Sequence, residues 1–274
     1  MKRCVSGYLT YINDKNKQQR LSDFYDSLNS LSALKNDQIE FISIDNSSLE
    51  EVRNNLKNSS IFSNCFHYEM NHYDVALFYT TTWYAKDKNV DYICFLYDDS
   101  IIFDDAFNDV ISFMDQHRDV NCVRIPYYDY QNQSYFNSEI TPKLINPDSI
   151  RHFNFVTNKK LDWEGPFNIG ERHFYKNNWH YTSRPIIWRR DFFESVLNAQ
   201  GNISRILQGF EDWAQPAFEK AGLKTGVLDK GMVKTTPVAR SARGLELKSR
   251  QEYTMSISVL NLRKDYENCC NNTR

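Results

Sequence analysis

The sequence predicts an α/β fold in which helices flank a central, mostly parallel sheet. Strand-like and helix-like segments alternate over the first 130 residues, which is the pattern of such a sheet. The segment DYICFLY at 91–97 is apolar almost throughout, as expected for a strand buried at the centre of the sheet. The chain has 274 residues, 41% of them hydrophobic, and can therefore bury about three-quarters of its unfolded surface.

The individual elements follow from hydrophobic spacing and turn residues. Strands are expected at 3–12, 38–44, 61–66, 91–97, 120–125, 184–188 and 224–228. Helices are expected at 21–34, 48–56, 74–86, 104–117 and 211–221, and another after Asp191. Ser48 and Glu51 have the spacing of a capping box. Residues 127–183 are rich in aromatic residues and Asn and show no clear period, so we expect an irregular half of the fold there.

Composition excludes several classes of protein. With 33 basic and 35 acidic residues, the net charge of −2 argues against a general nucleic-acid binder. Only Gly7 lies in the first half of the chain, and the other eight glycines fall between Gly165 and Gly244. A glycine-rich phosphate loop is therefore missing, which disfavours a dinucleotide-binding dehydrogenase or a P-loop NTPase.

The amino-terminal segment and the cysteines indicate a cytoplasmic protein. Residues 4–12 are too short and too polar for a signal peptide. The six cysteines include no C-x-x-C pair, and four of them sit in apolar strand-like runs, which is typical of a reducing compartment. Cys269 and Cys270 are interpreted as part of a solvated tail, and the alternatives are a lipidation site or a metal site.

The strongest chemical signal is LYDDS at 96–100. Here a buried strand ends in Asp98 and Asp99, and ligands of open α/β sheets bind beyond the carboxyl ends of the strands. Adjacent carboxylates at such a place can hold Mg²⁺ or Mn²⁺. The alternative interpretation is that one of them caps the next helix.

Three motifs occur in an order that resembles the GT-A glycosyltransferases of the family 2 type. They are IDNSS at 44–48, LYDDS at 96–100 and GFEDW at 209–213, and the resemblance covers roughly residues 3–230. It implies a single GT-A-like nucleotide-diphospho-sugar transferase domain over 1–274. Within it, 1–126 would bind the nucleotide sugar, 127–229 would be the acceptor and catalytic half, and 230–274 would be a basic carboxyl-terminal tail.

The resemblance also implies roles for individual residues of the donor site. Thr10, Tyr11 and Asn13 match the loop that touches the nucleotide, and Asp45 matches the residue that reads the base. Asp99 matches the main metal ligand, with Asp98 assisting at the metal and the sugar diphosphate.

Two departures from the family pattern concern the metal. Tyr97 stands where the family has its first metal-binding Asp, and residues 228–234 contain no His, which many members supply. Lys234 can take over part of the diphosphate charge. We still expect Mn²⁺ or Mg²⁺ as the cofactor.

The pair Glu211 and Asp212 matches the catalytic element of the family. A sugar hydroxyl that attacks the anomeric carbon must lose its proton, and a positioned carboxylate accepts it. Asp212 is the expected general base, with inversion of the anomeric centre, and Glu211 is the second candidate or a ligand of an acceptor hydroxyl. The alternative is that both acids only favour a helix amino terminus.

Acceptor contacts are expected from aromatic and charged residues of the second half. Trp163 and Glu164 lie in DWEGPFNIG at 162–170, which is expected to be a sugar-shaping loop, and Arg189 and Arg190 lie in a segment similar to the family's acceptor side. Sugar rings pack on aromatic faces, and their hydroxyls pair with charged groups. Each Trp considered singly is more often a core residue.

The expected substrates are a UDP-linked sugar and a glycan or lipid-linked acceptor. The basic segment 230–250 is a solvated surface, a cover for the diphosphate, or a peripheral contact with the anionic inner face of the membrane. Two rival functions remain open. One is a non-catalytic carbohydrate-binding protein, favoured by Tyr97, and the other is a nucleotidyltransferase, disfavoured because a glycine-rich basic loop is missing.

Overall fold

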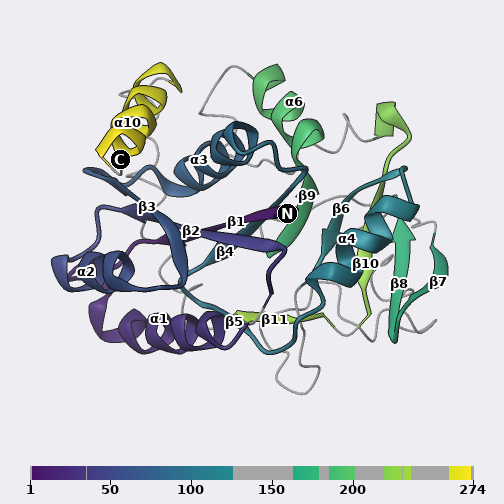
Figure 1. Cartoon of the computed structure of the whole chain (residues 1–274), viewed down its shortest axis with the longest axis horizontal. Coiled ribbons are helices and arrows are strands. Elements are labelled where there is room, and N and C mark those ends of the chain that lie inside the picture. The colour runs from purple at the N-terminus through teal and green to yellow at the C-terminus, as the bar shows by residue number, and fades with distance from the viewer. Residues whose placement is uncertain are drawn as a thin grey trace. The chain divides into compact units, whose positions relative to one another are not determined.

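The structure is a computed structural model of the chain (Figure 1). It describes residues 2–34, 36–125, 163–178, 185–200, 219–229, 231–235 and 259–272. These residues form two compact units: unit 1 takes the described residues of 1–101, 189–210 and 235–274, and unit 2 takes those of 102–188 and 211–234. The prediction of one domain with a boundary at residue 126 stays a prediction.

Unit 1 contains a parallel sheet with the strand order β3-β2-β1-β4. Its strands are β1 (Cys4–Thr10), β2 (Ile39–Asn46), β3 (Phe62–Tyr68) and β4 (Tyr92–Tyr97), and the short strand β5 (Ser100–Ile102) follows. All seven residues of β1 are buried, as expected for an inner strand of a parallel sheet covered on both faces. The predicted strands are found with small shifts of their ends.

Helices cover both faces of this sheet. They are α1 (Lys17–Ser32), α2 (Glu50–Asn58), α3 (Tyr73–Asp87), α6 (Arg190–Gln200) and α10 (Val259–Asn272). In Figure 1, α1 and α2 lie on one side of the sheet and α3 lies on the other. A Cβ atom at Gly7 of β1 would lie 2.0 Å from Thr81 Oγ1, so only glycine allows α3 this close to β1.

Helix α10 was not predicted, and it corrects the interpretation of the carboxyl-terminal cysteines. The Tyr266 ring stacks on Phe66 of β3 at 5.4 Å, and the Tyr266 hydroxyl donates to Asp87 at 2.7 Å. Cys269 and Cys270 belong to this packed helix and are partly buried, not part of a solvated tail. All six cysteines are free thiols.

Unit 2 contains a mixed set of strands in the order β9-β6-β10-β8-β7. They are β6 (Val120–Arg124), β7 (Glu164–Ile169), β8 (Arg172–Asn177), β9 (Ile186–Arg189) and β10 (Lys224–Leu228), and β11 (Val233–Thr235) follows. Strands β6 and β10 are parallel, and the other described pairs are antiparallel. Helix α4 (Phe107–Gln116) packs on them through Phe113, whose ring stacks on Phe174 at 4.5 Å.

The hairpin of β7 and β8 corrects two predictions. Residues 164–177 were expected to be irregular, and DWEGPFNIG was expected to be a loop, yet most of that segment is strand β7. The Phe167 ring of β7 lies 6.0 Å from the Phe113 ring of α4, so aromatic contacts with this helix stabilise the hairpin. Of the helix predicted at 211–221, only its helical end at 219–221 is described.

The capping box predicted at Ser48 and Glu51 is wrong. Helix α2 begins after Leu49 and has no side-chain cap. The Ser48 hydroxyl instead accepts the backbone N–H of Ile12 at 3.0 Å, which ties the end of β2 to the loop after β1. Among the described residues, no helix has the length and apolar character needed to cross a membrane.

Candidate active site

The parallel strands of unit 1 end side by side, and several predicted site residues meet there. Thr10 of β1 is in register with Asp45 of β2, and Asp45 is in register with His67 of β3. Leu9 pairs with Tyr97 of β4, so Asp98 follows at the same level. We call this end of the sheet, with Thr10, Asp45, His67 and Asp98, the carboxyl edge.

Asp98 is buried and bonded to a neighbour through each of its two oxygens. It is 2% exposed, and its Oδ1 pairs with the guanidinium of Arg20 from α1. Its Oδ2 accepts the backbone N–H of Tyr11 at 3.2 Å. Burial raises the pKa of Asp98 to about 6, the Arg20 charge opposes this shift, and Asp99 adds to it. At pH 7 the group is therefore mostly ionised, and it holds the loop after β1 against the end of β4.

A divalent cation fits Asp99 better than Asp98. The described residues contain no group of three or more His, Cys, Asp or Glu side chains arranged to hold a metal ion. Mg²⁺ needs only one or two carboxylates when water and substrate phosphates complete its shell. The positive charge of Arg20 beside Asp98 opposes a cation at that carboxylate. Asp99, 7% exposed, is the other carboxylate of the motif.

The loop after β1 is ordered by its own side chains. Asn13 Nδ2 donates to the Tyr11 hydroxyl at 2.8 Å, and Asn13 Oδ1 accepts the N–H of Lys15 at 2.9 Å. Asn16 Nδ2 donates to the Tyr11 carbonyl at 3.2 Å. The Thr10 hydroxyl is buried and has no hydrogen-bond partner among the described residues. Since buried hydroxyls are rarely left unpaired, the Thr10 hydroxyl, at the end of β1 beside this loop, is a candidate to bond a ligand.

Asp45 is held in one orientation by two donors. Its Oδ1 accepts the N–H of Ser48 at 3.1 Å, and its Oδ2 lies 2.6 Å from His67 Nδ1. Asp45 is 3% exposed, and burial raises its pKa, while the hydrogen bonds from Ser48 and His67 oppose that shift. Each carboxylate oxygen has two lone pairs, so Asp45 can accept a further hydrogen bond from a ligand.

The two arginines predicted at the acceptor side lie at the other end of β4. Arg189 Nη1 donates to the hydroxyl of Tyr92, the first residue of β4, at 3.1 Å, and its guanidinium stacks over the Tyr92 ring. Arg190 Nε donates to the carbonyl of Val90 at 2.7 Å. The structure therefore does not bring Arg189 and Arg190 together with Asp98 and Asp99.

Trp163 and Glu164 belong to unit 2. Glu164 pairs with Lys176 at 3.1 Å and also with Lys224, so it lies between two ammonium groups. The Trp163 indole N–H is buried and has no partner among the described residues. Lys234, considered for the diphosphate, lies over the Phe103 ring at 5.3 Å. Glu211, Asp212 and most of the basic segment 230–250 lie outside the described residues.

Two residues that bond the predicted site residues at this end of the sheet were not predicted. Arg20 reaches Asp98 from α1, which no local pattern indicates. His67 could have been found, because the rule that ligands bind beyond the carboxyl ends of strands applies to β3 as well as to β2 and β4.

Comparison with known proteins decides the family. The model of Glycosyl transferase family 2 matches residues 15–184, more than half of the chain. The chain belongs to glycosyl transferase family 2. The match includes Asp45, Asp98 and Asp99 and ends before Glu211 and Asp212.

One solved structure agrees with this family 2 assignment in fold. The crystal structure of S. aureus TarS 1-349 has a TM-score of 0.50 and 15% identity, with 96% of this chain and 69% of that chain covered. A second crystal structure of S. aureus TarS has a TM-score of 0.49 and 14% identity, with 85% and 36% covered. This chain thus spans about a third of the length of that second one. No curated protein sequence matches the chain.

These findings confirm the predicted family and the predicted fold class. The fold is the α/β, GT-A-like fold with helices on both faces of the parallel strands, which is a glycosyltransferase fold. The residue roles predicted for the donor, the metal and the base remain predictions, and they are developed below.

Proposed function

We propose that this family 2 chain transfers a sugar from a UDP-linked donor to a hydroxyl of a glycan or lipid-linked acceptor, with inversion at the anomeric carbon. The observation that carries the proposal is the carboxyl edge of unit 1. Three parallel strands bring Thr10, Asp45 and the Asp98–Asp99 pair to one end of the sheet. That end is where open α/β sheets bind their ligands.

The donor is held by groups that differ in chemistry. Asp45 accepts the ring N–H of uracil, and the loop of Tyr11 and Asn13 lies against the nucleotide. The Thr10 hydroxyl, which has no partner among the described residues, bonds the donor. Arg20 and Asp98 hold this loop in place.

Asp99 is the residue that would hold Mg²⁺ or Mn²⁺ in this proposal. When bound, the cation would neutralise charge that develops on the diphosphate leaving group. The chain's own contribution is to present one buried carboxylate at the end of β4 while Asp98 is kept occupied by Arg20.

Asp212 carries the proton transfer. Its carboxylate accepts the proton of the acceptor hydroxyl as the hydroxyl oxygen forms a bond to the anomeric carbon. The bond from that carbon to the diphosphate oxygen breaks, its electron pair stays on the diphosphate, and UDP leaves. Attack opposite to the leaving group inverts the configuration.

The Asp212→Asn variant tests the function. Transfer should fall by about 10²–10⁴-fold, because Asn cannot accept the proton, while donor binding stays within about twofold. Glu211→Gln is the matched control and should lose far less. If Asp212 only caps a helix, the Asp212→Asn variant should remain active, because Asn caps a helix about as well as Asp. Transfer by Asp212→Asn above about a tenth of the wild-type rate would reject Asp212 as the base.

A non-catalytic carbohydrate-binding protein is the second candidate. Tyr97 replaces an expected metal ligand, and Asp98 is paired with Arg20, so the metal site is reduced to Asp99 among the described residues. Hydrolysis of UDP-sugars, measured with and without Mn²⁺, separates the two functions. A transferase releases UDP in a Mn²⁺-dependent manner, and a binding protein releases none.

A further inference from the structure

A histidine with no role so far completes the surroundings of Asp45. His67 is the sixth residue of β3 and is in register with Asp45 of the neighbouring strand. Its Nδ1 lies 2.6 Å from Asp45 Oδ2, and its Nε2 lies 3.0 Å from Nη1 of Arg53 on α2. A chain of three side chains from α2, β3 and β2 therefore ends on the carboxylate that we assign to the base.

The direction of the hydrogen bonds in this chain is fixed by Arg53. A guanidinium only donates, so Nε2 of His67 must accept, and the ring proton must reside on Nδ1. His67 is thus a neutral imidazole that donates to Asp45. Glu69, 94% exposed and 3.6 Å from Nε2, is too distant to reverse this order.

The backbone of His67 is held as well. Cys269 of α10 donates its thiol to the His67 carbonyl at 3.4 Å. The side chain is about a third exposed, so the ring is anchored at both nitrogens without being enclosed. These contacts leave the imidazole little freedom to turn away from Asp45.

The consequence for Asp45 is chemical as well as geometric. Burial favours a protonated carboxyl at Asp45, and the donors Ser48 and His67 favour the ionised form. An ionised carboxylate can only accept, whereas a protonated one also donates. Uracil presents N3–H, a donor, and cytosine presents the lone pair of N3 at the same place. An accepting Asp45 therefore selects uracil and disfavours cytosine.

We propose that His67, oriented by Arg53, is a positioning residue that keeps Asp45 a fixed hydrogen-bond acceptor and so sets the preference for uridine over cytidine nucleotides. This inference rests on the proposed function, in which Asp45 contacts the base. It adds a specificity role for a residue that does not itself touch the donor.

The test measures the dissociation constants of UDP and CDP by calorimetry in four variants of the whole chain. His67→Phe keeps a ring and removes both nitrogens, and His67→Asn restores a donor close to the position of Nδ1. Asp45→Ala removes the carboxylate that is proposed to contact the base. His173→Phe is the matched control, because His173 is an exposed histidine of unit 2 bonded to Asn168 at 2.7 Å.

The expected result is a change of selectivity. Wild type and His173→Phe should prefer UDP over CDP by about tenfold or more, and His67→Phe should reduce that ratio to about twofold or less. His67→Asn should recover most of the preference, which a purely structural role would not do. Thermal melting confirms that each variant is folded.

Other outcomes overturn the proposal in distinguishable ways. If Asp45→Ala abolishes the UDP preference but His67→Phe retains it, His67 has no positioning role and the proposed function stands. If His67→Asn loses as much selectivity as His67→Phe, the ring itself and not its hydrogen bond matters. If wild type shows no preference for UDP, or Asp45→Ala keeps it, the base-reading role fails and the inference fails with it.

Discussion

The two ends of the parallel sheet in unit 1 use their charged residues differently. At the carboxyl edge, Asp45 and Asp98 are buried carboxylates that accept hydrogen bonds from loops and from His67 and Arg20. At the opposite end, which we call the amino edge, cations donate to backbone carbonyls. Lys2 bonds the Ile39 carbonyl at 2.6 Å, and Arg190 bonds that of Val90.

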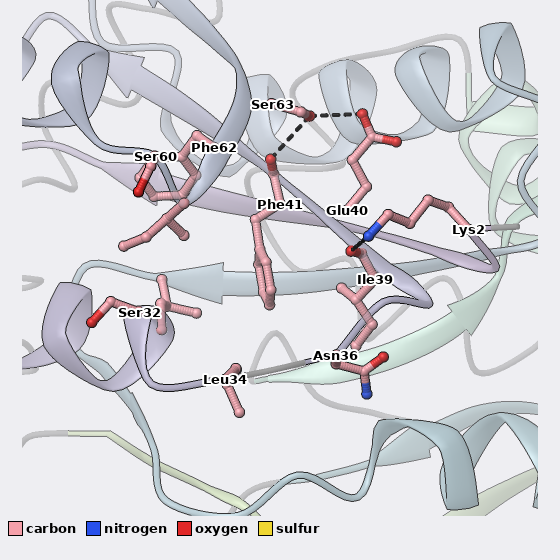
Figure 2. A pocket seen from close by; sticks show the side chains of 12 residues that line it. Lys2, Ser32, Leu34, Asn36, Ile39, Glu40, Phe41, Ser60, Phe62 and Ser63 are labelled. Carbon is pink, nitrogen blue, oxygen red and sulfur yellow. Dashed lines mark hydrogen bonds between the residues drawn. The ribbon is translucent and has the colours of Figure 1, made fainter.

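A cavity lies at the amino edge, where we propose no functional site. It measures about 520 Å³ and lies beside the starts of β2 and β3 and the end of α1, with Lys2 reaching across to the Ile39 carbonyl (Figure 2). Glu40, which lines the cavity, accepts hydrogen bonds from the hydroxyls of Ser63 and Tyr84 at 2.7 and 2.6 Å. A cavity or a basic residue is therefore not evidence of a site on its own. The edge of the sheet on which it lies decides how it is interpreted.

The largest effect on stability is expected from breaking the buried ion pair of the carboxyl edge. Arg20→Met leaves Asp98 without its counter-charge and should lower the free energy of unfolding by about 3–5 kcal/mol. Arg190→Met, at the amino edge, should cost only about 1–3 kcal/mol, because Asp191, its nearest ion-pair partner, is 82% exposed. Urea denaturation measures both. Equal losses would remove the distinction between the two edges.

The next effect concerns the metal. At a UDP concentration of about 100 times its dissociation constant, ligand binding stabilises wild type by about 2.7 kcal/mol. In the presence of Mn²⁺ this stabilisation should increase, and Asp99→Ala should lose the increase while remaining folded. Glu40→Gln, at the amino edge, is the control and should keep it. Thermal melting with UDP, with and without Mn²⁺, measures this difference. If Asp99→Ala and wild type respond equally to Mn²⁺, Asp99 is not the metal ligand.

A smaller effect depends on pH. His72 precedes α3, is 2% exposed, and burial lowers its pKa to about 4. The unfolded chain therefore binds a proton below pH 6.5 that the folded chain does not, so stability is present above pH 6.5 and is lost as the pH falls toward 4. Between pH 7 and pH 5 wild type should lose about 2 kcal/mol more than His72→Phe. Identical pH dependence in the two proteins would contradict the burial of a neutral His72.

The smallest effect is expected at Arg189. Arg189→Ala removes a cation–π contact with Tyr92 and should cost about 0.5–1 kcal/mol of stability. Because Arg189 lies at the amino edge, the rate of sugar transfer should change by less than about twofold. The loss of a contact made in the transition state would lower that rate much more. A tenfold loss of transfer in a folded variant would show that Arg189 contacts the acceptor, and the comparison of the edges would then be wrong.

Much of the parallel sheet could be predicted, because its strands are short apolar runs that end in polar residues. The rule that ligands bind beyond the carboxyl ends of strands indicated Asp98 and Asp99, and the family resemblance indicated Asp45. Helix α10 was missed although Leu262 and Tyr266, both buried, have helical spacing. The hairpin of β7 and β8 was missed because its residues do not alternate between apolar and polar, and Ile169 is the only residue of β7 that is buried.

The partners of the site residues were harder to predict than the residues themselves. Arg20 of α1 bonds Asp98, which lies 78 positions further along the chain. Arg53 of α2 bonds His67 of β3. Such contacts depend on how helices pack on the sheet, which composition and spacing do not determine. The assisting role predicted for Asp98 is the part of the metal prediction that its pairing with Arg20 bears on most, and Asp99 stays the expected main ligand.

We propose that the carboxyl edge of unit 1 binds the uridine diphosphate donor. A crystal structure with UDP and Mn²⁺ would locate both ligands, because the anomalous signal of manganese identifies the ion independently of the nucleotide. We expect the uracil within hydrogen-bond distance of Asp45, which His67 orients, and the manganese at the Asp99 carboxylate. Nucleotide density in the amino-edge cavity beside Lys2 and Glu40, with none at Asp45, would contradict it.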